Sequence, residues 1–240
     1  MAKKQYVYKG RSRVITQMPK VEIGNKTLID SCSFLIMASS PLANLKMLGS
    51  PLINDQYNDD VLNLYLDGIH TVCKNPNIII VGGSQIKKIL KHNRRAEFSV
   101  IENVLFELTN NAEDLRVGLN ATKACPLVVF DAQFIPSFKS MELLFENKKE
   151  SSMLWSKRNV DKIGCDISNS KIINFYAYKC PNKLLGGYYL SASDADKMRR
   201  RVVGSTFNRN KFDFEMLTEL RIRAKEDNSS SYRLDENNEN

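Results

Sequence analysis

Residues 77–92, NIIIVGGSQIKKILKH, contain the clearest fold signal in the chain. Three isoleucines and a valine run into Gly82-Gly83-Ser84, and a basic segment with apolar residues at helical spacing follows. The pattern predicts a buried strand, a glycine turn and a helix. Units of this kind build α/β domains. We therefore expect an α/β or α+β fold, with a single domain, a mixed sheet and several helices.

The glycines of this turn do not match a known nucleotide-binding spacing. A P-loop requires GxxxxGK[ST] and a dinucleotide-binding turn requires GxGxxG, and neither pattern includes Gly82 and Gly83. The simplest interpretation is a structural turn in which Ser84 caps the helix that follows. The alternative is contact between an anion and the free amides at the N-terminus of that helix.

Other segments extend the α/β pattern along the chain. The sequence predicts strands at LVVFD (127–131), ELLFE (142–146) and IINFYAY (172–178). It predicts further helices from Asp59, over 98–109, from Ser193 to about Gly204, and over 212–225. The apolar segment 28–40 fits a helix and a strand equally well.

Composition limits the class of protein. The chain has 240 residues, of which 42% are hydrophobic and 26% charged, so most of it should fold. No apolar run approaches the roughly 18 residues of a membrane-spanning helix, and the basic start lacks the apolar stretch of a secretory signal. Five cysteines, an odd number, argue against a disulfide framework. We therefore expect a cytoplasmic or nuclear protein without a transmembrane segment.

The distribution of polar residues suggests three parts. Residues 1–27 form a basic arm, and residues 28–226 form a single globular α/β-type domain. Residues 227–240 are polar and have no apolar periodicity, so we expect a disordered tail there.

Basic residues give the chain a formal net charge of +8. Several of them gather after the glycine turn and in the helix that begins near Ser193. Cations that reach phosphates release counterions, so such clusters predict contact with an RNA or DNA backbone without sequence preference. The alternative is that these clusters are ordinary solvated surfaces. The candidate nucleic-acid-binding residues are Lys87, Lys88, Lys91, Arg94, Arg95, Lys197, Arg199, Arg200 and Arg201.

A second constellation consists of Asp131, which ends LVVFD, and an E-x-K spacing formed by Glu146 and Lys148. It resembles the metal-dependent nucleases of the PD-(D/E)xK type. That resemblance implies that two carboxylates hold Mg²⁺ and that the lysine orients the attacking water. It also implies a further carboxylate, for which Glu102 and Glu107 are candidates. The alternative is that Asp131 marks the end of a strand and that Glu146 and Lys148 belong to a solvated edge.

No complete catalytic set is evident, since the chain has only two histidines and no nucleophile motif. We therefore expect a non-enzymatic nucleic-acid-binding protein that contacts the phosphate backbone. One alternative is the Mg-dependent nuclease with Asp131, Glu146 and Lys148, and the other is a viral coat or matrix protein. Nucleic acid is the expected partner, and self-association is a further expectation. No cofactor is expected, except Mg²⁺ under the nuclease hypothesis.

Overall fold

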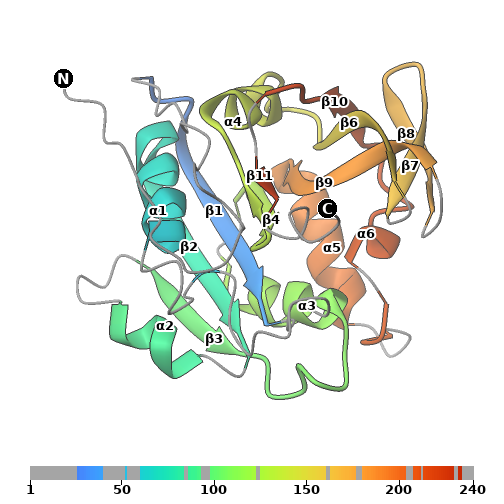
Figure 1. Cartoon of the computed structure of the whole chain (residues 1–240). Helices are drawn as coiled ribbons and strands as arrows, with labels where there is room; N and C mark the ends of the chain where they lie inside the picture. Colours follow the sequence, from blue (N-terminus) through green and yellow to red (C-terminus); the bar gives the residue numbers. More distant parts are fainter. Residues whose placement is uncertain are drawn as a thin grey trace, which may run out of the picture.

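The computed structural model describes residues 26–39, 52, 60–83, 86–92, 98–122, 125–160, 163–176, 180–203, 208–211, 213–229 and 232–233. In this part, one nine-stranded mixed sheet has the order β3-β2-β1-β4-β9-β6-β10-β8-β7 (Figure 1). Its strands are β1 (Ile29–Ala38), β2 (Cys73–Gly82), β3 (Ser99–Glu102), β4 (Leu127–Asp131), β6 (Ser152–Val160), β7 (Gly164–Ser168), β8 (Lys171–Tyr176), β9 (Cys180–Leu190) and β10 (Arg223–Glu226). β5 (Phe134–Ile135) pairs separately with β11 (Tyr232–Arg233).

Six helices flank the sheet in the described residues. They are α1 (Asp60–Val72), α2 (Ile86–His92), α3 (Asn111–Ala121), α4 (Phe138–Phe145), α5 (Ala192–Val203) and α6 (Asp213–Met216). The predicted class, a single α/β-type domain with a mixed sheet and several helices, is confirmed. None of the described helices is both long and apolar enough to cross a membrane.

Strands β3, β2, β1 and β4 run parallel and form one half of the sheet. Ile36 of β1 lies opposite Ile80 of β2 on one side and Phe130 of β4 on the other. The chain passes from β1 outward to β2 and β3, and then returns to place β4 on the other side of β1. The direction of strand order therefore reverses between β1 and β4. β9 pairs antiparallel with β4 and begins the mixed half.

Alternating side chains of the central strands supply two separate cores, because successive residues of a strand point to opposite faces. Phe34 and Ile36 of β1 pack with α1, α2 and α4 on one face. Leu35 and Met37 pack with α3, α5 and α6 on the other face. Figure 1 shows α3 beside the arrowheads of β1 and β2. These cores also explain why 28–40 was ambiguous, since a strand buried on both faces has no alternation.

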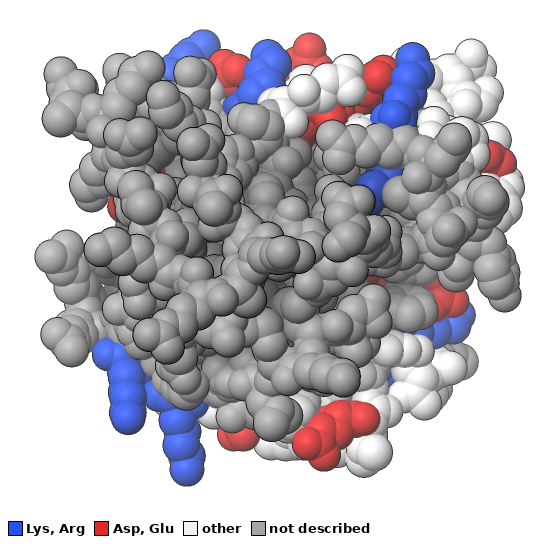
Figure 2. All heavy atoms as spheres, in the orientation of Figure 1, with Lys and Arg blue, Asp and Glu red and all other residues white. Residues whose placement is uncertain are grey.

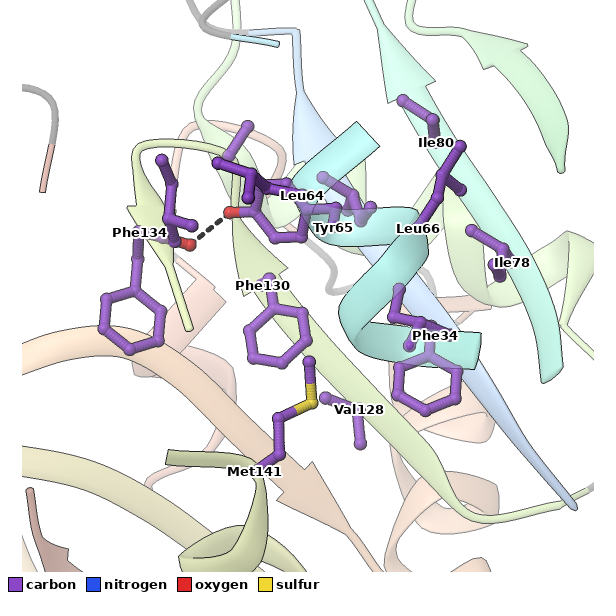
Figure 3. Packing of buried hydrophobic residues seen from close by; sticks show 14 of the residues in the cluster. Phe34, Leu64, Tyr65, Leu66, Ile78, Ile80, Val128, Phe130, Phe134 and Met141 are labelled. Atoms are coloured by element: carbon purple, nitrogen blue, oxygen red, sulfur yellow. Dashed lines mark hydrogen bonds between the residues drawn. The ribbon is translucent and has the colours of Figure 1, made fainter. Parts of the chain in front are cut away.

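Aromatic side chains dominate the first core (Figure 3). The ring of Phe130 lies between those of Tyr65 and Phe134, with centroid distances of 5.9 and 6.3 Å. The hydroxyl of Tyr65 donates hydrogen bonds to the carbonyl oxygens of Phe134 and Asp131, the latter at 3.1 Å. These hydrogen bonds fix α1, which carries Tyr65, to the segment that follows β4.

Several predicted elements are confirmed. The stretch 77–92 contains the end of β2 and all of α2, and the Ile86 amide donates a hydrogen bond to the Gly83 carbonyl (3.2 Å). Ser84, the expected cap, and Gln85 lie outside the described residues. LVVFD is β4, most of IINFYAY lies in β8, and the helix expected from Asp59 is α1. The helix expected from Ser193 is α5, which begins one residue earlier. The hydroxyl of Ser191 accepts a hydrogen bond from the Asp194 amide (3.3 Å) and so caps that helix.

The predicted helix over 98–109 is wrong. Residues Ser99–Glu102 form β3, because they add to the open edge of β2 with Val100 opposite Ile80. Turns follow over 104–108, and Val104 and Leu108 are 73% and 76% exposed. The helical spacing of these apolar residues therefore did not mark a buried face.

The predicted strand ELLFE is also wrong, because Glu142–Phe145 belong to α4 and Glu146 directly follows it. Ser137 precedes this helix, and its hydroxyl accepts a hydrogen bond from the Ser140 amide (3.0 Å). The Ser140 hydroxyl accepts in return from the Ser137 amide (3.1 Å), which completes a capping box. Met141 and Leu144 are then buried on one helix face. The cap precedes the apolar run, so the run itself contains no sign that it belongs to a helix.

The C-terminal part contains a short helix and two strands where the sequence predicted one helix over 212–225 and then disorder. α6 ends at Met216, and β10 pairs parallel with β6. The carboxylate of Asp227 is buried and accepts a hydrogen bond from the Ser140 hydroxyl (2.7 Å). Ordered structure therefore continues past position 226. Residues 1–25 of the expected arm and 234–240 of the expected tail lie outside the described residues.

The two glycines of the opening stretch should differ in their tolerance of a side chain. A Cβ atom on Gly83 would lie 2.6 Å from the Ser39 carbonyl oxygen and 2.7 Å from the Phe106 ring. A Cβ atom on Gly82 would meet nothing closer than 3.4 Å. Overpacking of this kind typically costs about 1 to 3 kcal/mol, so Gly83→Ala should lower the free energy of unfolding by that amount. Urea denaturation should show a smaller loss for Gly82→Ala, and equal losses would contradict the close approach.

Candidate active site

The carboxyl edge of the parallel strands is the natural place for a ligand. In open α/β sheets, ligands bind outside the carboxyl ends of the strands where the strand order reverses, and here that point lies between β1 and β4. Four residues stand at this edge. They are Ser39 after β1, Gly83 after β2, Asn103 after β3 and Asp131 at the end of β4.

Asp131 is held at the reversal point by its neighbours. Its side chain shares the sheet face of Val129, on the side of α3 and α6. One carboxylate oxygen accepts a hydrogen bond from the Gln133 amide (3.0 Å). The Ala132 amide donates to the Met37 carbonyl of β1 (3.0 Å), which ties the turn to the neighbouring strand. Asp131 as a whole is half-buried.

A second carboxylate, Asp213, comes from the start of α6. Its amide donates a hydrogen bond to the Asn111 side-chain oxygen (2.9 Å) at the N-terminus of α3. The segment before it is fastened to the same helix end, because the Ala112 amide donates to the Lys211 carbonyl (3.3 Å). Asp213 is only 7% exposed. The start of α3 therefore brings a distant part of the chain to the site.

Asp131 and Asp213 lie close enough for their charges to interact. Burial raises the pKa of Asp213 to about 6, and the negative charge of Asp131 adds to the rise. The hydroxyl of Tyr188 lies close to Asp213 and opposes this rise. Burial and the charge of Asp213 in turn raise the pKa of Tyr188 well above its ordinary value. Within the described residues, no group completes a well-formed hydrogen bond with the Tyr188 hydroxyl.

A third carboxylate, Asp114 of α3, joins the ends of two strands. One of its oxygens accepts hydrogen bonds from the Ser39 hydroxyl and from the Asn103 side-chain amide (2.7 Å). The other accepts from the Ser39 backbone amide (3.3 Å). Burial raises the pKa of Asp114 to about 6, and these hydrogen bonds oppose the rise. The charge of Asp131 raises it further, so Asp114 lies near the same edge.

The donor set at this edge suits a cation that brings other ligands with it. The described residues contain no cluster of three or more His, Cys, Asp or Glu side chains arranged to hold a metal ion. Mg²⁺ is commonly held by one or two carboxylates, with substrate phosphates and water completing its shell. Asp131 and Asp213 fit that pattern, because a cation between them would offset both the burial of the Asp213 charge and its repulsion by Asp131, which together raise the pKa of Asp213.

The structure separates the three residues of the predicted nuclease set. Only Asp131 lies at the carboxyl edge. Glu146 lies after α4, is exposed and forms an ion pair with Lys225, which lowers the pKa of Glu146. Lys148 is exposed in the following turn, and its carbonyl oxygen accepts a hydrogen bond from the Tyr189 hydroxyl (2.8 Å). The two further candidates, Glu102 and Glu107, are both exposed, at the end of β3 and in the turn beyond it.

The basic residues of α5 are paired within the protein. Lys197 contacts Asp194 (2.9 Å), and Arg200 forms an ion pair with Asp196 one turn away. Two others also have partners: Arg201 contacts Glu219 (2.8 Å), and Arg199 donates to the Thr122 hydroxyl (2.9 Å).

Lys87 and Lys91 are exposed on α2, whereas the side chain of Lys88 and residues Arg94 and Arg95 lie outside the described residues. Figure 2 shows the described basic side chains at separate places around the rim of one face, with acidic ones among them. On this face they do not form one continuous surface.

Comparison with solved structures shows which known folds this arrangement of strands and helices resembles. The CTP:phosphocholine cytidylyltransferase of Streptococcus pneumoniae matches with a TM-score of 0.68 and 15% identity, over 85% of this chain and 93% of that one. The inositol-1-phosphate CTP transferase of T. maritima matches with a TM-score of 0.62 and 12% identity, over 81% and 84%. A UDP-glucose pyrophosphorylase bound to UDP-glucose matches with a TM-score of 0.58 and 14% identity, over 82% and 90%.

The chain has a nucleotidyltransferase-like fold. At the level of sequence alone, no family model and no curated protein matches it. The likeness therefore lies in the arrangement of the strands and helices, which the sequence does not reveal by identity.

The nucleotidyltransferase-like fold corrects the functional hypothesis drawn from the sequence. The expected nucleic-acid-binding protein is wrong, and so are the two alternatives, the nuclease and the viral coat or matrix protein, because these solved structures are enzymes of nucleotide transfer. The expected RNA or DNA partner is wrong for the same reason. The net charge gave the wrong prediction because it counts cations without showing which of them are available to a ligand. Lys197, Arg200 and Arg201 are each paired with a nearby acid.

Sequence reasoning missed most of the residues at the edge. Asp213 was assigned to an ordinary helix, and Asp114, Asn103 and Ser39 were not singled out. One signal was available for Asp213, which stands between two phenylalanines in the sequence FDF and so is an acid in an apolar setting. No local signal marks Asp114, because its partners are distant in the chain.

Proposed function

We propose that this protein is a nucleotidyltransferase that joins the nucleotidyl group of a nucleoside triphosphate to a small phosphorylated acceptor and releases pyrophosphate. The observation that carries the proposal is the pair Asp131 and Asp213 at the strand-order reversal of a nucleotidyltransferase-like fold. The solved structures of similar fold are named for phosphocholine and inositol 1-phosphate as acceptors, which supports an alcohol or sugar phosphate here.

Asp131 and Asp213 would hold a divalent cation such as Mg²⁺. When bound, such a cation neutralises charge on the triphosphate and on the leaving pyrophosphate. Asp131 is only half-buried at the carboxyl edge, and the buried carboxylate of Asp213 gains a compensating charge. This replaces the expectation of no cofactor with a specific proposal about two residues.

The reaction itself requires mainly positioning. An oxygen of the acceptor phosphate attacks the α-phosphorus, the bond from that phosphorus to the bridging oxygen breaks, and pyrophosphate leaves with both electrons of that bond. Because transfer of this kind depends on alignment and charge stabilisation, the protein needs fixed carboxylates and a rigid edge. The hydrogen bonds of Asp131 to Gln133 and of Asp213 to Asn111 provide that rigidity.

The proposal is tested with the full chain, MgCl₂, each of the four common nucleoside triphosphates and a panel of phosphorylated acceptors. Phosphocholine, inositol 1-phosphate and glucose 1-phosphate form the first panel. We expect pyrophosphate release that depends on both substrates, together with a nucleoside diphosphate conjugate identified by mass spectrometry. Conversion of the triphosphate without any conjugate, or no binding of any triphosphate in calorimetry, would refute the assignment.

A further inference from the structure

Asp114 is the hub of the hydrogen bonds that join β1 and β3 at the candidate site. Its side chain is 1% exposed, and both of its oxygens are occupied by the residues that directly follow these two strands. Ser39 uses both its hydroxyl and its backbone amide for this contact. Asn103 also donates its backbone amide to the Gly82 carbonyl (2.9 Å), which includes β2 in the same arrangement.

The neighbouring acid shows that this environment is unusual. Glu113 is 2% exposed, and its charge is matched by two contacts from Arg116 (2.7 and 2.6 Å) and by Arg209 at 3.7 Å. Among the described residues, no lysine or arginine forms an ion pair with Asp114. A buried charge without a cation is costly, and here only the hydrogen bonds from Ser39 and Asn103 offset that cost. Burial alone therefore does not account for an acid at position 114.

Geometry does account for it. Ser39 is the last described residue before the chain leaves β1 at the reversal of strand order. Its amide and hydroxyl are fixed by Asp114, and its carbonyl oxygen lies against Gly83. Both hydrogen-bond donors of Ser39 are thus fixed by Asp114 at the carboxyl edge, where the nucleotide would bind.

We infer that Asp114 is a positioning residue that fixes Ser39 at the carboxyl edge of the parallel strands, where the nucleotide would bind. This inference rests on the proposed function for its effect on catalysis, but the contact itself is tested separately. Asp114 accepts its hydrogen bonds from Ser39 and Asn103, and it positions the site through these two residues.

Hydrogen–deuterium exchange tests the contact without any substrate. Asp114→Ala removes both acceptors of the Ser39 amide and hydroxyl, so exchange of that amide should become about tenfold faster or more. Asp114→Asn keeps the shape and one acceptor oxygen, so exchange should rise less and the fold should be retained. Exchange at Ser39 that equals wild type in both folded variants would overturn the inference, even if the protein transfers nucleotides.

Kinetics test the consequence for the site. For Asp114→Ala, kcat/KM should fall about 100-fold, with much of the change in KM for the nucleotide, because small displacements of positioning groups have effects of this size. Asp114→Asn should recover part of that loss. A fall confined to kcat in both variants, with KM unchanged, would contradict a positioning role.

Asp194→Asn is the matched control. Like Asp114, Asp194 lies in the first turn of a helix and accepts a hydrogen bond from a serine hydroxyl (Ser151, 2.6 Å). Its helix follows the end of β9, which pairs with the start of β4 and not with the carboxyl end where the site lies. Asp194→Asn should leave the exchange of the Ser39 amide and the KM for the nucleotide unchanged. A loss of kcat/KM in Asp194→Asn as large as in Asp114→Ala would overturn the inference. Absence of transfer in wild type would refute the proposed function alone, because the exchange result still decides the contact.

Discussion

Asp131→Asn is expected to lower the rate of nucleotidyl transfer about 1,000-fold, since a lost carboxylate ligand removes several kcal/mol of charge stabilisation at the reacting phosphate. The variant should still fold. An asparagine oxygen can accept the hydrogen bond from the Gln133 amide, and asparagine has nearly the same size and shape as aspartate. Initial rates of pyrophosphate release at saturating Mg²⁺ measure the effect. Isothermal titration with Mg²⁺ and nucleotide should show weaker cation binding in the same variant.

Glu146→Gln is the control for this experiment. Glu146 is an exposed acid paired with Lys225, away from the carboxyl edge, so the substitution should change the rate little. If Asp131→Asn retains wild-type activity, or if Glu146→Gln loses as much as Asp131→Asn, the site does not lie at the reversal of strand order.

Asp213→Asn is expected to stabilise the metal-free protein while it abolishes transfer. The folded-state pKa of Asp213 is raised from 3.8 to about 6, so the native state binds this proton more tightly than the unfolded chain does. The stability from this group is fully present below 3.8 and is lost as the pH rises through about 6. At neutral pH the buried charge then costs up to about 3 kcal/mol, which asparagine avoids.

Thermal unfolding in EDTA gives the test. Between about pH 7.5 and pH 5, the Tm of wild type should rise on acidification. In Asp213→Asn the Tm at pH 7.5 should be about 5 °C higher or more, and the remaining pH dependence should be that of Asp114. Acids whose pKa is lowered, such as Glu146 and Glu150, titrate below this window. A Tm below that of wild type at pH 7.5 would contradict the charge repulsion.

Mg²⁺ offers a second measurement on the same pair. A cation that binds only the folded protein raises its stability by mass action. Mg²⁺ with a nucleotide should therefore raise the Tm of wild type more than that of Asp213→Asn. An equal rise in both proteins would place the cation elsewhere.

The sequence predicted the correct secondary structure where the local pattern was strong enough to decide it without contacts to the rest of the chain. The strands of NIIIVGG and LVVFD are continuous apolar runs, which is how strands buried on both faces of a parallel sheet look. Shorter segments failed because the tertiary context decides their type. Ser99–Glu102 becomes a strand by adding to the edge of β2, and ELLFE becomes a helix because Ser137 and Ser140 form a cap upstream of it.

The candidate site was predictable only in part, for a similar reason. Asp131 was found because an acid at the end of a buried strand is visible in one short stretch. Its proposed partner Asp213 was not, because only the contact between α6 and the start of α3 brings the two together. The E-x-K spacing supplied a false partner in Glu146, which is close to Asp131 in sequence but belongs to a different part of the surface.

The attachment of α6 to α3 also sets the order in which the molecule can be completed. Asn111 and Asp213 are 102 residues apart, and the Asn110 side chain contacts the Asn210 carbonyl across 100 residues. Closing so long a loop is slow compared with local pairing. During synthesis the strands β1–β4, which include Asp131, and then β6–β9 emerge before Asp213 does. We therefore expect Asp213 to join Asp131 late in folding. The repulsion between the two carboxylates then opposes only the docking of α6 onto α3.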